Sequence, residues 1–154
     1  MDYTFNYQSG RVLDEFQMIY ITKGGGTFES ASCKNVTIGE GIVFFLFPGE
    51  WHRFKPEQLT GWDSYWVGFK GKFAENLVAN GYLSVNKPVV KVGYNEEIVS
   101  LYQRILEAGN EERQVISNIY PESLFTCLDI FITGRKTTIT RTNRSYRKLT
   151  RHGY

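Results

Sequence analysis

Cysteine, histidine and proline are scarce in this sequence of 154 residues, which contains two cysteines, two histidines and four prolines. Cys33 and Cys127 lie far apart and are more typical of buried thiols than of a disulfide. No stretch approaches the roughly 18 apolar residues of a membrane span, and the N-terminus has no signal-peptide pattern. These absences argue against a disulfide-rich secreted protein and against a membrane protein, so we expect a cytoplasmic location.

Acidic residues are missing from one end of the chain. Residues 135–154 contain five arginines, two lysines and no aspartate or glutamate, so the overall charge of +2 leaves residues 1–134 with a net charge of −5. An acidic body of this kind is a poor partner for nucleic acid. The basic segment could bind phosphate groups weakly, although such a segment is more often simply solvated.

Glycine and aromatic residues are abundant instead. Fifteen glycines indicate many turns, and 42% apolar with 16% aromatic residues is enough to build a core. The length suits one domain and is too short for two ordinary ones. The composition therefore favours a single β-rich domain.

Six segments have the composition of β-strands. They are rich in β-branched and aromatic residues, and turns such as residues 24–26 and 48–49 separate them. Residues 42–47 are apolar throughout, which predicts a strand covered on both faces. Several short strands with no helix between them are typical of a barrel or sandwich. The predicted strands are residues 16–22, 27–32, 35–38, 42–47, 51–54 and 61–69.

The apolar spacing then changes to that of helices. A short helix is predicted to end at Gly81, and a longer amphipathic helix is predicted to begin at an Asn95 N-cap and to stop at Gly109. Residues 115–132 also have helical character, although Pro121 interrupts them. The sequence therefore predicts a mostly β fold followed by two or three helices.

The usual catalytic groupings are absent. Residues 41–52 resemble a cupin turn, and metal-dependent cupin enzymes surround one ion with about three imidazoles and a carboxylate. Here the globular part has only His52, because His152 lies in the basic segment, and His52 with Glu50 cannot complete such a site. The sequence also has no phosphate-binding loop and no nucleophile elbow. We therefore expect no enzyme activity, no catalytic residues, no metal and no cofactor.

A ligand pocket is better supported than an active site. Small barrels can hold one ligand in their mouth, between apolar walls and a few polar groups. Seven residues on strands or strand ends could face such a pocket, and each also has a structural interpretation. The aromatic side chains could belong to the core, Lys23 could be solvated, and His52 could hold the turn at 48–49 by a hydrogen bond. The candidates are Tyr20, Lys23, Trp51, His52, Phe54, Ser64 and Trp66.

Three segments carry a resemblance to a known family. They are residues 19–28, residues 41–54 with their Pro-Gly-Glu-x-His element, and residues 61–71 with their Trp-x-Gly-Phe element. Together they resemble the sensor domain of the AraC/XylS family of bacterial transcriptional regulators. This resemblance implies a cupin-like (jelly-roll) β-barrel that binds a small effector, often a sugar, followed by dimerisation helices. In that family a separate pair of helix-turn-helix motifs reads DNA.

The resemblance also predicts how the chain is organised. Residues 1–13 would form an N-terminal arm, residues 14–71 the effector-binding barrel, and residues 72–132 a helical part with the dimerisation helices. Residues 133–154 would be a disordered basic tail, and no helix-turn-helix domain is expected. In arabinose-binding members of the family, the sugar-contacting positions match Lys23, Phe54 and Ser64, of which only Lys23 keeps a strong donor. A buried sugar hydroxyl without a partner is costly, so the effector is not expected to be arabinose.

The resemblance stops near Ile119, and a frameshift near codons 118–120 is one hypothesis for this. Back-translation permits a shifted frame that resembles the family's dimerisation helix, its linker and the start of its DNA-binding half. The gene sequence tests the idea, because a forced stop codon or an unrelated peptide in that frame would remove it. On this hypothesis the chain senses an effector but cannot regulate transcription alone.

The leading interpretation is therefore a sensing domain for a small molecule, a sugar in particular, in an AraC-type regulator truncated before its DNA-binding domain. It would form a homodimer, have no membrane partner, and reach DNA only through the missing domain. The alternatives are a cupin-type enzyme, which bound metal would reveal, and a standalone carbohydrate-binding or dimerisation module.

Overall fold

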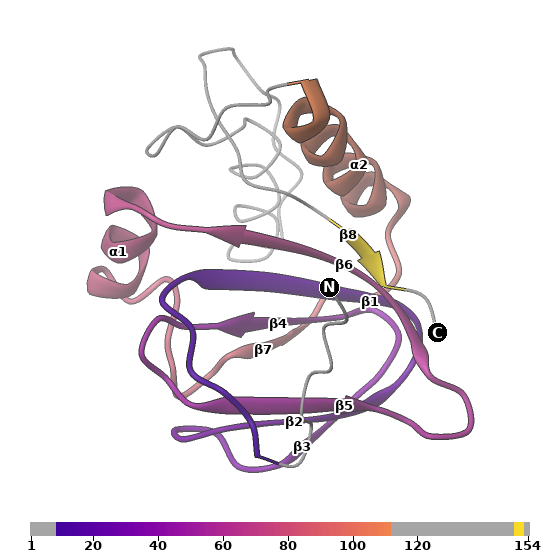
Figure 1. The fold of residues 1–154 in the computed structure, drawn as a ribbon, viewed down its shortest axis with the longest axis horizontal. Coiled ribbons are helices and arrows are strands. Elements are labelled where there is room, and N and C mark those ends of the chain that lie inside the picture. The colour runs from indigo at the N-terminus through magenta and orange to yellow at the C-terminus, as the bar shows by residue number, and fades with distance from the viewer. Residues whose placement is uncertain (1–8, 112–149, 153–154) are drawn as a thin grey trace.

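The computed structural model describes residues 9–111 and 150–152, which form two antiparallel sheets with two helices (Figure 1). The larger sheet has the strand order β7-β4-β1-β6-β8, and the smaller has the order β3-β2-β5. The elements are β1 (Phe16–Gly24), β2 (Gly26–Ser30), β3 (Val36–Ile38), β4 (Ile42–Leu46), β5 (His52–Pro56), β6 (Trp62–Phe69), α1 (Lys72–Ala79), β7 (Val89–Lys91), α2 (Glu96–Glu111) and β8 (Thr150–His152).

Strand β1 is the centre of the larger sheet, paired with β4 on one side and β6 on the other. Its first six residues are all buried, because successive side chains point to opposite faces and both faces are covered. Phe16, Met18 and Tyr20 face the helices, whereas Ile19 and Ile21 face the smaller sheet. One strand thus separates two hydrophobic clusters.

Helix α2 covers the first of these faces. Its buried side chains Ile98, Leu101, Tyr102 and Ile105 follow the predicted helical spacing and pack against the sheet. The Tyr102 hydroxyl also donates a hydrogen bond of 3.0 Å to the backbone oxygen of Met18. Figure 1 shows both helices on the side of the larger sheet that lies away from β2, β3 and β5.

Aromatic rings fill the space between the two sheets at one end. Phe44 lies at their centre, with ring centroids 5.0 Å from Phe28, 5.6 Å from Phe54 and 6.1 Å from Trp62. The chain turns from β1 into β2 at this end, and a Cβ on Gly26 would come within 2.8 Å of the Trp62 ring. This end of the sandwich is therefore packed tightly around aromatic side chains.

The predicted fold class is confirmed: a cupin-like β-sandwich with helices after the strands. All six predicted strands are present, and β4 is covered on both faces as its apolar run predicts. The pattern does not predict β7, because three residues are too few to show a period. Cys33 is a free thiol that is only partly buried, so its predicted full burial is wrong.

Two of the three helix ends predicted from the sequence agree with the structure. Asn95 caps α2, since its Oδ1 accepts a hydrogen bond of 2.8 Å from the backbone N–H of Glu97. Helix α1 ends before Gly81, which has a φ of 77°. The predicted stop at Gly109 is wrong, because α2 continues to Glu111. A glycine inside a helix costs only about 1 kcal/mol relative to alanine, so it does not end a helix by itself. The predicted helical segment 115–132 lies outside the described residues.

Strand β8 falls in the predicted basic tail. Its residues pair antiparallel with β6, with Thr150 opposite Trp66 and His152 opposite Ser64. This differs from the disorder expected for residues 133–154, and the rest of that tail lies outside the described residues. The edge of β6 that does not pair with β1 presents backbone donors and acceptors. An extended segment can pair with these groups regardless of its side chains.

Candidate ligand-binding site

The N-terminal segment, residues 9–13, lies along the start of β5, at the end of the sandwich opposite the turn from β1 into β2. Arg11 and His52 exchange two backbone hydrogen bonds, of 2.9 and 3.0 Å, and the Leu13 oxygen accepts one of 2.9 Å from Gly49. The segment thereby extends the edge of the smaller sheet at the start of β5 before it enters β1. Figure 1 shows this indigo stretch running from the smaller sheet to the larger one. Residues 1–8 of the predicted arm lie outside the described residues.

His52 is buried between the sheets and joins two partners. Its Nδ1 lies 3.3 Å from the backbone oxygen of Glu50, and its Nε2 lies 3.4 Å from Nε of Arg11. Because an arginine nitrogen can only donate, Nε2 must accept, and Nδ1 therefore carries the proton that it donates to Glu50. Burial, and secondarily the Arg11 charge, lowers the pKa of His52 to about 4. His52 is therefore a neutral acceptor at neutral pH.

Arg11 brings a positive charge to the inner side of the smaller sheet. Residues directly opposite in an antiparallel pair have side chains on the same face, so Arg11 points inward with His52. Its guanidinium carbon lies 6.0 Å from the centroid of the Phe54 ring, which stacks on His52 at 6.3 Å. Arg11 was not a sequence candidate, because a single arginine in an aperiodic segment carries no pattern.

Polar groups also line the opposing wall near the start of β1. Gln17 is buried and donates a hydrogen bond of 3.0 Å to Glu15 Oε1. The same carboxylate oxygen lies 3.0 Å from the position that a Cβ on Gly68 would take, so the glycine leaves room for it. The corner between β1 and β2 makes these strands run in opposite directions, which places the start of β1 and the end of β2 at the same end of the sandwich. Neither Glu15 nor Gln17 was a sequence candidate.

Four of the seven predicted residues face the space between the sheets. Ser64 pairs with Ile21 and Trp66 pairs with Ile19, so both share the inward face of the larger sheet. His52 and Phe54 approach from the smaller sheet, as the contacts above show. The structure thus brings together His52, Phe54, Ser64 and Trp66.

Tyr20 lies on the other face of β1 and is not part of this group. Its hydroxyl donates a hydrogen bond of 2.8 Å to the Gly93 oxygen and accepts one of 2.9 Å from the Asn95 N–H. Burial raises the pKa of Tyr20 above its usual value. The residue anchors the start of α2, which is the structural role and not the predicted ligand contact.

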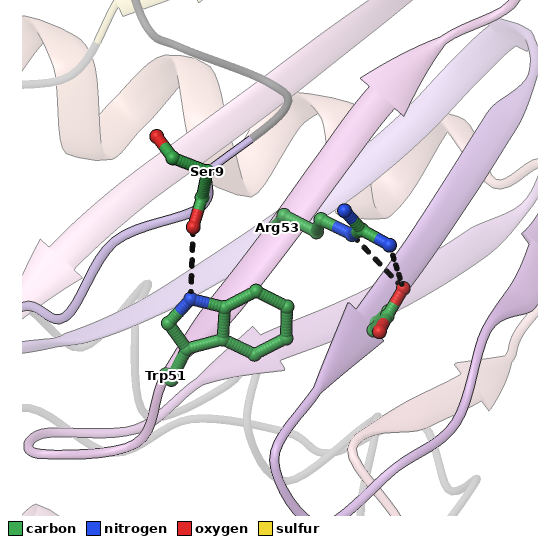
Figure 2. Close-up of polar contacts among 4 residues, drawn as sticks. Ser9, Trp51 and Arg53 are labelled. Carbon is green, nitrogen blue, oxygen red and sulfur yellow. Dashed lines mark hydrogen bonds and ion pairs between the residues drawn. The ribbon is translucent and has the colours of Figure 1, made fainter.

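Lys23 and Trp51 also lie away from the interior. Lys23 is exposed near the end of β1, opposite Asp63 and beyond an irregularity in the pairing of β1 with β6. Trp51 is on the outer face, where its indole N–H donates to the Ser9 oxygen at 3.1 Å (Figure 2). Neither residue has the inward-facing side chain that was predicted. The irregularity in the pairing of β1 with β6 turns Lys23 outward, and the alternation of side chains along β5 turns Trp51 outward.

The chemistry of the interior suits binding. It combines aromatic rings with a neutral imidazole, a guanidinium, a carboxylate, an amide and a hydroxyl, so it offers both donors and acceptors. Glu50, the carboxylate of the cupin-like turn, is engaged elsewhere, since its Oε1 accepts a hydrogen bond of 2.7 Å from the Ser32 N–H. In the part of the chain that is described, no cluster of three or more His, Cys, Asp or Glu side chains could hold a metal ion.

Comparison with known proteins identifies the family. Residues 2–124 match the AraC-like ligand binding domain. The chain belongs to this family. The AraC-like domain is also 22% identical over 120 residues to the "Raffinose operon transcriptional regulatory protein RafR" of Pediococcus pentosaceus. That alignment covers 78% of this chain but 43% of the regulator, so the chain spans less than half the length of that relative.

The match confirms the resemblance seen in the sequence: the chain is a ligand-sensing domain of the AraC type, related to a transcriptional regulator. Neither helix among residues 9–111 has both the length and the apolar character needed to cross a membrane.

Proposed function

We propose that this AraC-like domain senses a small saccharide, bound between the sheets where the N-terminal segment crosses. The observation that supports this is the placement of two pairs of polar side chains at the same end of the two sheets. Arg11 and His52 come from the smaller sheet, and Glu15 and Gln17 from the start of β1. Trp66, on the same inward face as Ile19, supplies an aromatic surface.

A neutral polyhydroxylated ligand suits this set better than other small molecules. Each sugar hydroxyl can donate and accept, so it can satisfy both the guanidinium and the carboxylate. An apolar ligand would offer these polar groups no hydrogen bonds, and an anionic ligand would face the Glu15 carboxylate. The relative's name links that regulator to a raffinose operon, so raffinose and its component sugars are the first ligands to test.

Thermal denaturation and calorimetry of the full chain test this proposal. Raffinose, melibiose, sucrose and arabinose would be compared, with mannitol as the matched polyol control. A ligand present at 100 times its Kd stabilises the folded state by about 2.7 kcal/mol and raises Tm. We expect an oligosaccharide to do so and arabinose to have little effect. If no saccharide raises Tm at millimolar concentration while the protein is folded, the proposal is wrong.

Two variants on opposite faces of β1 locate the site. Gln17→Met removes the amide from the inward face and should weaken saccharide binding about tenfold, the effect of losing roughly one hydrogen bond. Tyr20→Phe removes a hydroxyl from the outward face and should lower stability by about 1–3 kcal/mol, because the Asn95 N–H is left unpaired, without changing affinity. A loss of affinity in folded Tyr20→Phe with none in Gln17→Met would exclude this site.

We further propose that the domain binds without catalysis and works as a homodimer in a transcriptional regulator. Stoichiometric bound metal would revive the cupin-enzyme alternative. The apolar stripe of α2 is already used within the domain, so a partner subunit would have to contact the exposed side of α2, which includes Gln103 and Arg104, or residues beyond it. Light scattering of the full chain gives the oligomeric state. In a whole regulator, ligand occupancy would shift the equilibrium of a DNA-binding part.

A further inference from the structure

The N-terminal segment is also held from its outer face, on the side opposite Arg11 and His52. The indole N–H of Trp51 donates a hydrogen bond of 3.1 Å to the backbone oxygen of Ser9. Figure 2 shows the indole of Trp51 directed at this oxygen, with Arg53 beside the ring. This contact fixes the chain two residues before the inward-pointing Arg11.

Gly10 fits against the same indole ring. A Cβ at this position would lie 2.7 Å from Nε1 and Cε2 of Trp51 and 2.7 Å from the His52 oxygen, closer than side-chain carbons approach. Gly10 also has a φ of 68°, in the left-handed region that favours glycine. The backbone of the segment therefore lies directly on the ring, and any larger residue would push it away.

The ring itself is braced by the neighbouring strands. The guanidinium carbon of Arg53 lies 5.7 Å from the centroid of Trp51. Arg53 in turn bonds Oε2 of Glu29 on β2, from Nε at 3.0 Å and from Nη2 at 2.9 Å. A row of side chains thus runs from β2 across β5 to the N-terminal segment, all on the outer face.

We propose that Trp51 and Gly10 are positioning residues that hold the Arg11 guanidinium beside His52 and Phe54. The Arg11–His52 pairing is an isolated bridge, and a short two-stranded pairing is at best marginal by itself. The contacts of Trp51 with Ser9 and Gly10 hold the backbone in place on the outer face. Because the backbone at residues 9 and 10 is fixed, the Arg11 side chain that follows is directed inward. The effect on ligand affinity rests on the proposed function, whereas the positioning of Arg11 does not.

The pKa of His52 depends on the position of Arg11, so measuring this pKa tests the proposal without any ligand. The chain has two histidines, so imidazole NMR signals of the full chain can be titrated and assigned with a His152→Gln control. The charged groups that act on the His52 ring are Arg11, which lowers its pKa, and Glu50, which raises it. In Trp51→Phe, which keeps a ring but loses the indole N–H, Arg11 should move away. The pKa of His52 should then rise by at least about 0.7, which is the effect of a unit charge at about 4 Å in water and so a lower bound for a buried ring.

Background variants separate positioning from other effects. In Arg11→Met the pKa of His52 should already be raised, and adding Trp51→Phe should change it no further. Thr27→Ala, also exposed on the outer face but away from the N-terminal segment, should leave the pKa unchanged. An unchanged His52 pKa in folded Trp51→Phe, or an equal rise in the Arg11→Met background, would overturn the proposal.

Gly10→Ala provides an independent route that leaves β5 intact, and it should raise the pKa of His52 in the same way. If Trp51→Phe does not fold, this variant decides the outcome. Raffinose then serves as the ligand probe: its affinity should fall about tenfold in Trp51→Phe but not further when Arg11→Met is already present. If raffinose does not bind at all, the proposed ligand class fails, while the His52 titration still tests the positioning.

Discussion

His52 holds the turn, as one of its two sequence interpretations predicts, and its ring also faces the interior where we propose that the ligand binds. Its Nδ1 contacts the Glu50 oxygen and so holds the turn before β5, while its Nε2 faces Arg11 inside the sandwich. The same ring can therefore support the turn and accept the Arg11 hydrogen bond inside the sandwich. Its neutrality comes from burial, reinforced by the Arg11 charge.

The depressed pKa of His52 predicts how stability depends on pH. The folded state holds His52 neutral down to about pH 4, whereas the unfolded chain takes up a proton below about pH 6.5. The unfolded state therefore binds more protons between these values, so stability is fully present above pH 6.5 and falls as pH decreases. The slope from this residue is at most about 1.4 kcal/mol per pH unit.

Urea unfolding at pH 7, 6 and 5 measures this effect, with His52→Gln as the comparison because glutamine does not titrate. The loss of stability between pH 7 and 5 should be smaller in the variant, although carboxylates contribute equally to both proteins. Equal slopes in wild type and variant would mean that His52 is not held neutral by the fold.

At the scale of elements, the strands and helices owe their stability to the faces they bury. Val43 and Phe45 of β4 lie in the cluster under the helices, and Phe44 and Leu46 lie between the sheets. This explains why the segment is apolar at every position. Helix α2 buries only one face, so its apolar residues recur every three or four positions, as on one face of a helix.

Helix α2 gives a direct test of this packing. Ile98 is fully buried against the sheet, so Ile98→Ala should lower the free energy of unfolding by about 2–5 kcal/mol. Gln103 is exposed on the same helix, and Gln103→Ala should change it by less than about 0.5 kcal/mol. Chemical denaturation measures both. Similar values for the two variants would contradict the docking of α2 described above.

For the whole molecule, the larger sheet separates two hydrophobic clusters, one under the helices and one between the sheets, where we propose that the ligand binds. Strands β1 and β4 each have a neighbour on both edges and burial on both faces. The N-terminal segment, by contrast, is attached through a single bridge, a backbone hydrogen bond from Gly49 to Leu13 and a few side-chain contacts. Stability should therefore be distributed unevenly across the chain.

Hydrogen exchange of the full chain should show this distribution. Amides of β1 and β4 should exchange most slowly, and those of residues 9–13 much faster, because only the latter open without disrupting a core. A bound saccharide should slow exchange in residues 9–17 and 52–56 and leave α2 almost unaffected. If residues 9–13 are as protected as β1 without ligand, the segment is part of the core and not a separately attached element.

Most of the fold could be predicted from the sequence, because its strands and helices are specified by patterns within a few neighbouring residues. The apolar runs, the glycine turns and the Asn95 cap each act over a few residues, so their strands and helix start were predicted correctly. Two short strands were missed, β7 and β8, because three residues carry too little pattern. Gly109 was misjudged as a stop because tertiary packing over the rest of α2 outweighs the small cost of one glycine.

The candidate site was only partly predictable, since membership depends on which face each strand turns inward. The sequence by itself determined the sandwich and the family, and it named seven site candidates, of which four, including His52 and Trp66, face inward in the structure. Only the tertiary structure showed that Tyr20 faces the helices and that Trp51 lies outside, because a period of two specifies alternation but not direction. It also brought Arg11 to His52, as this contact joins residues 41 positions apart. Such contacts depend on how the two sheets and the N-terminal segment come together, which no local pattern encodes.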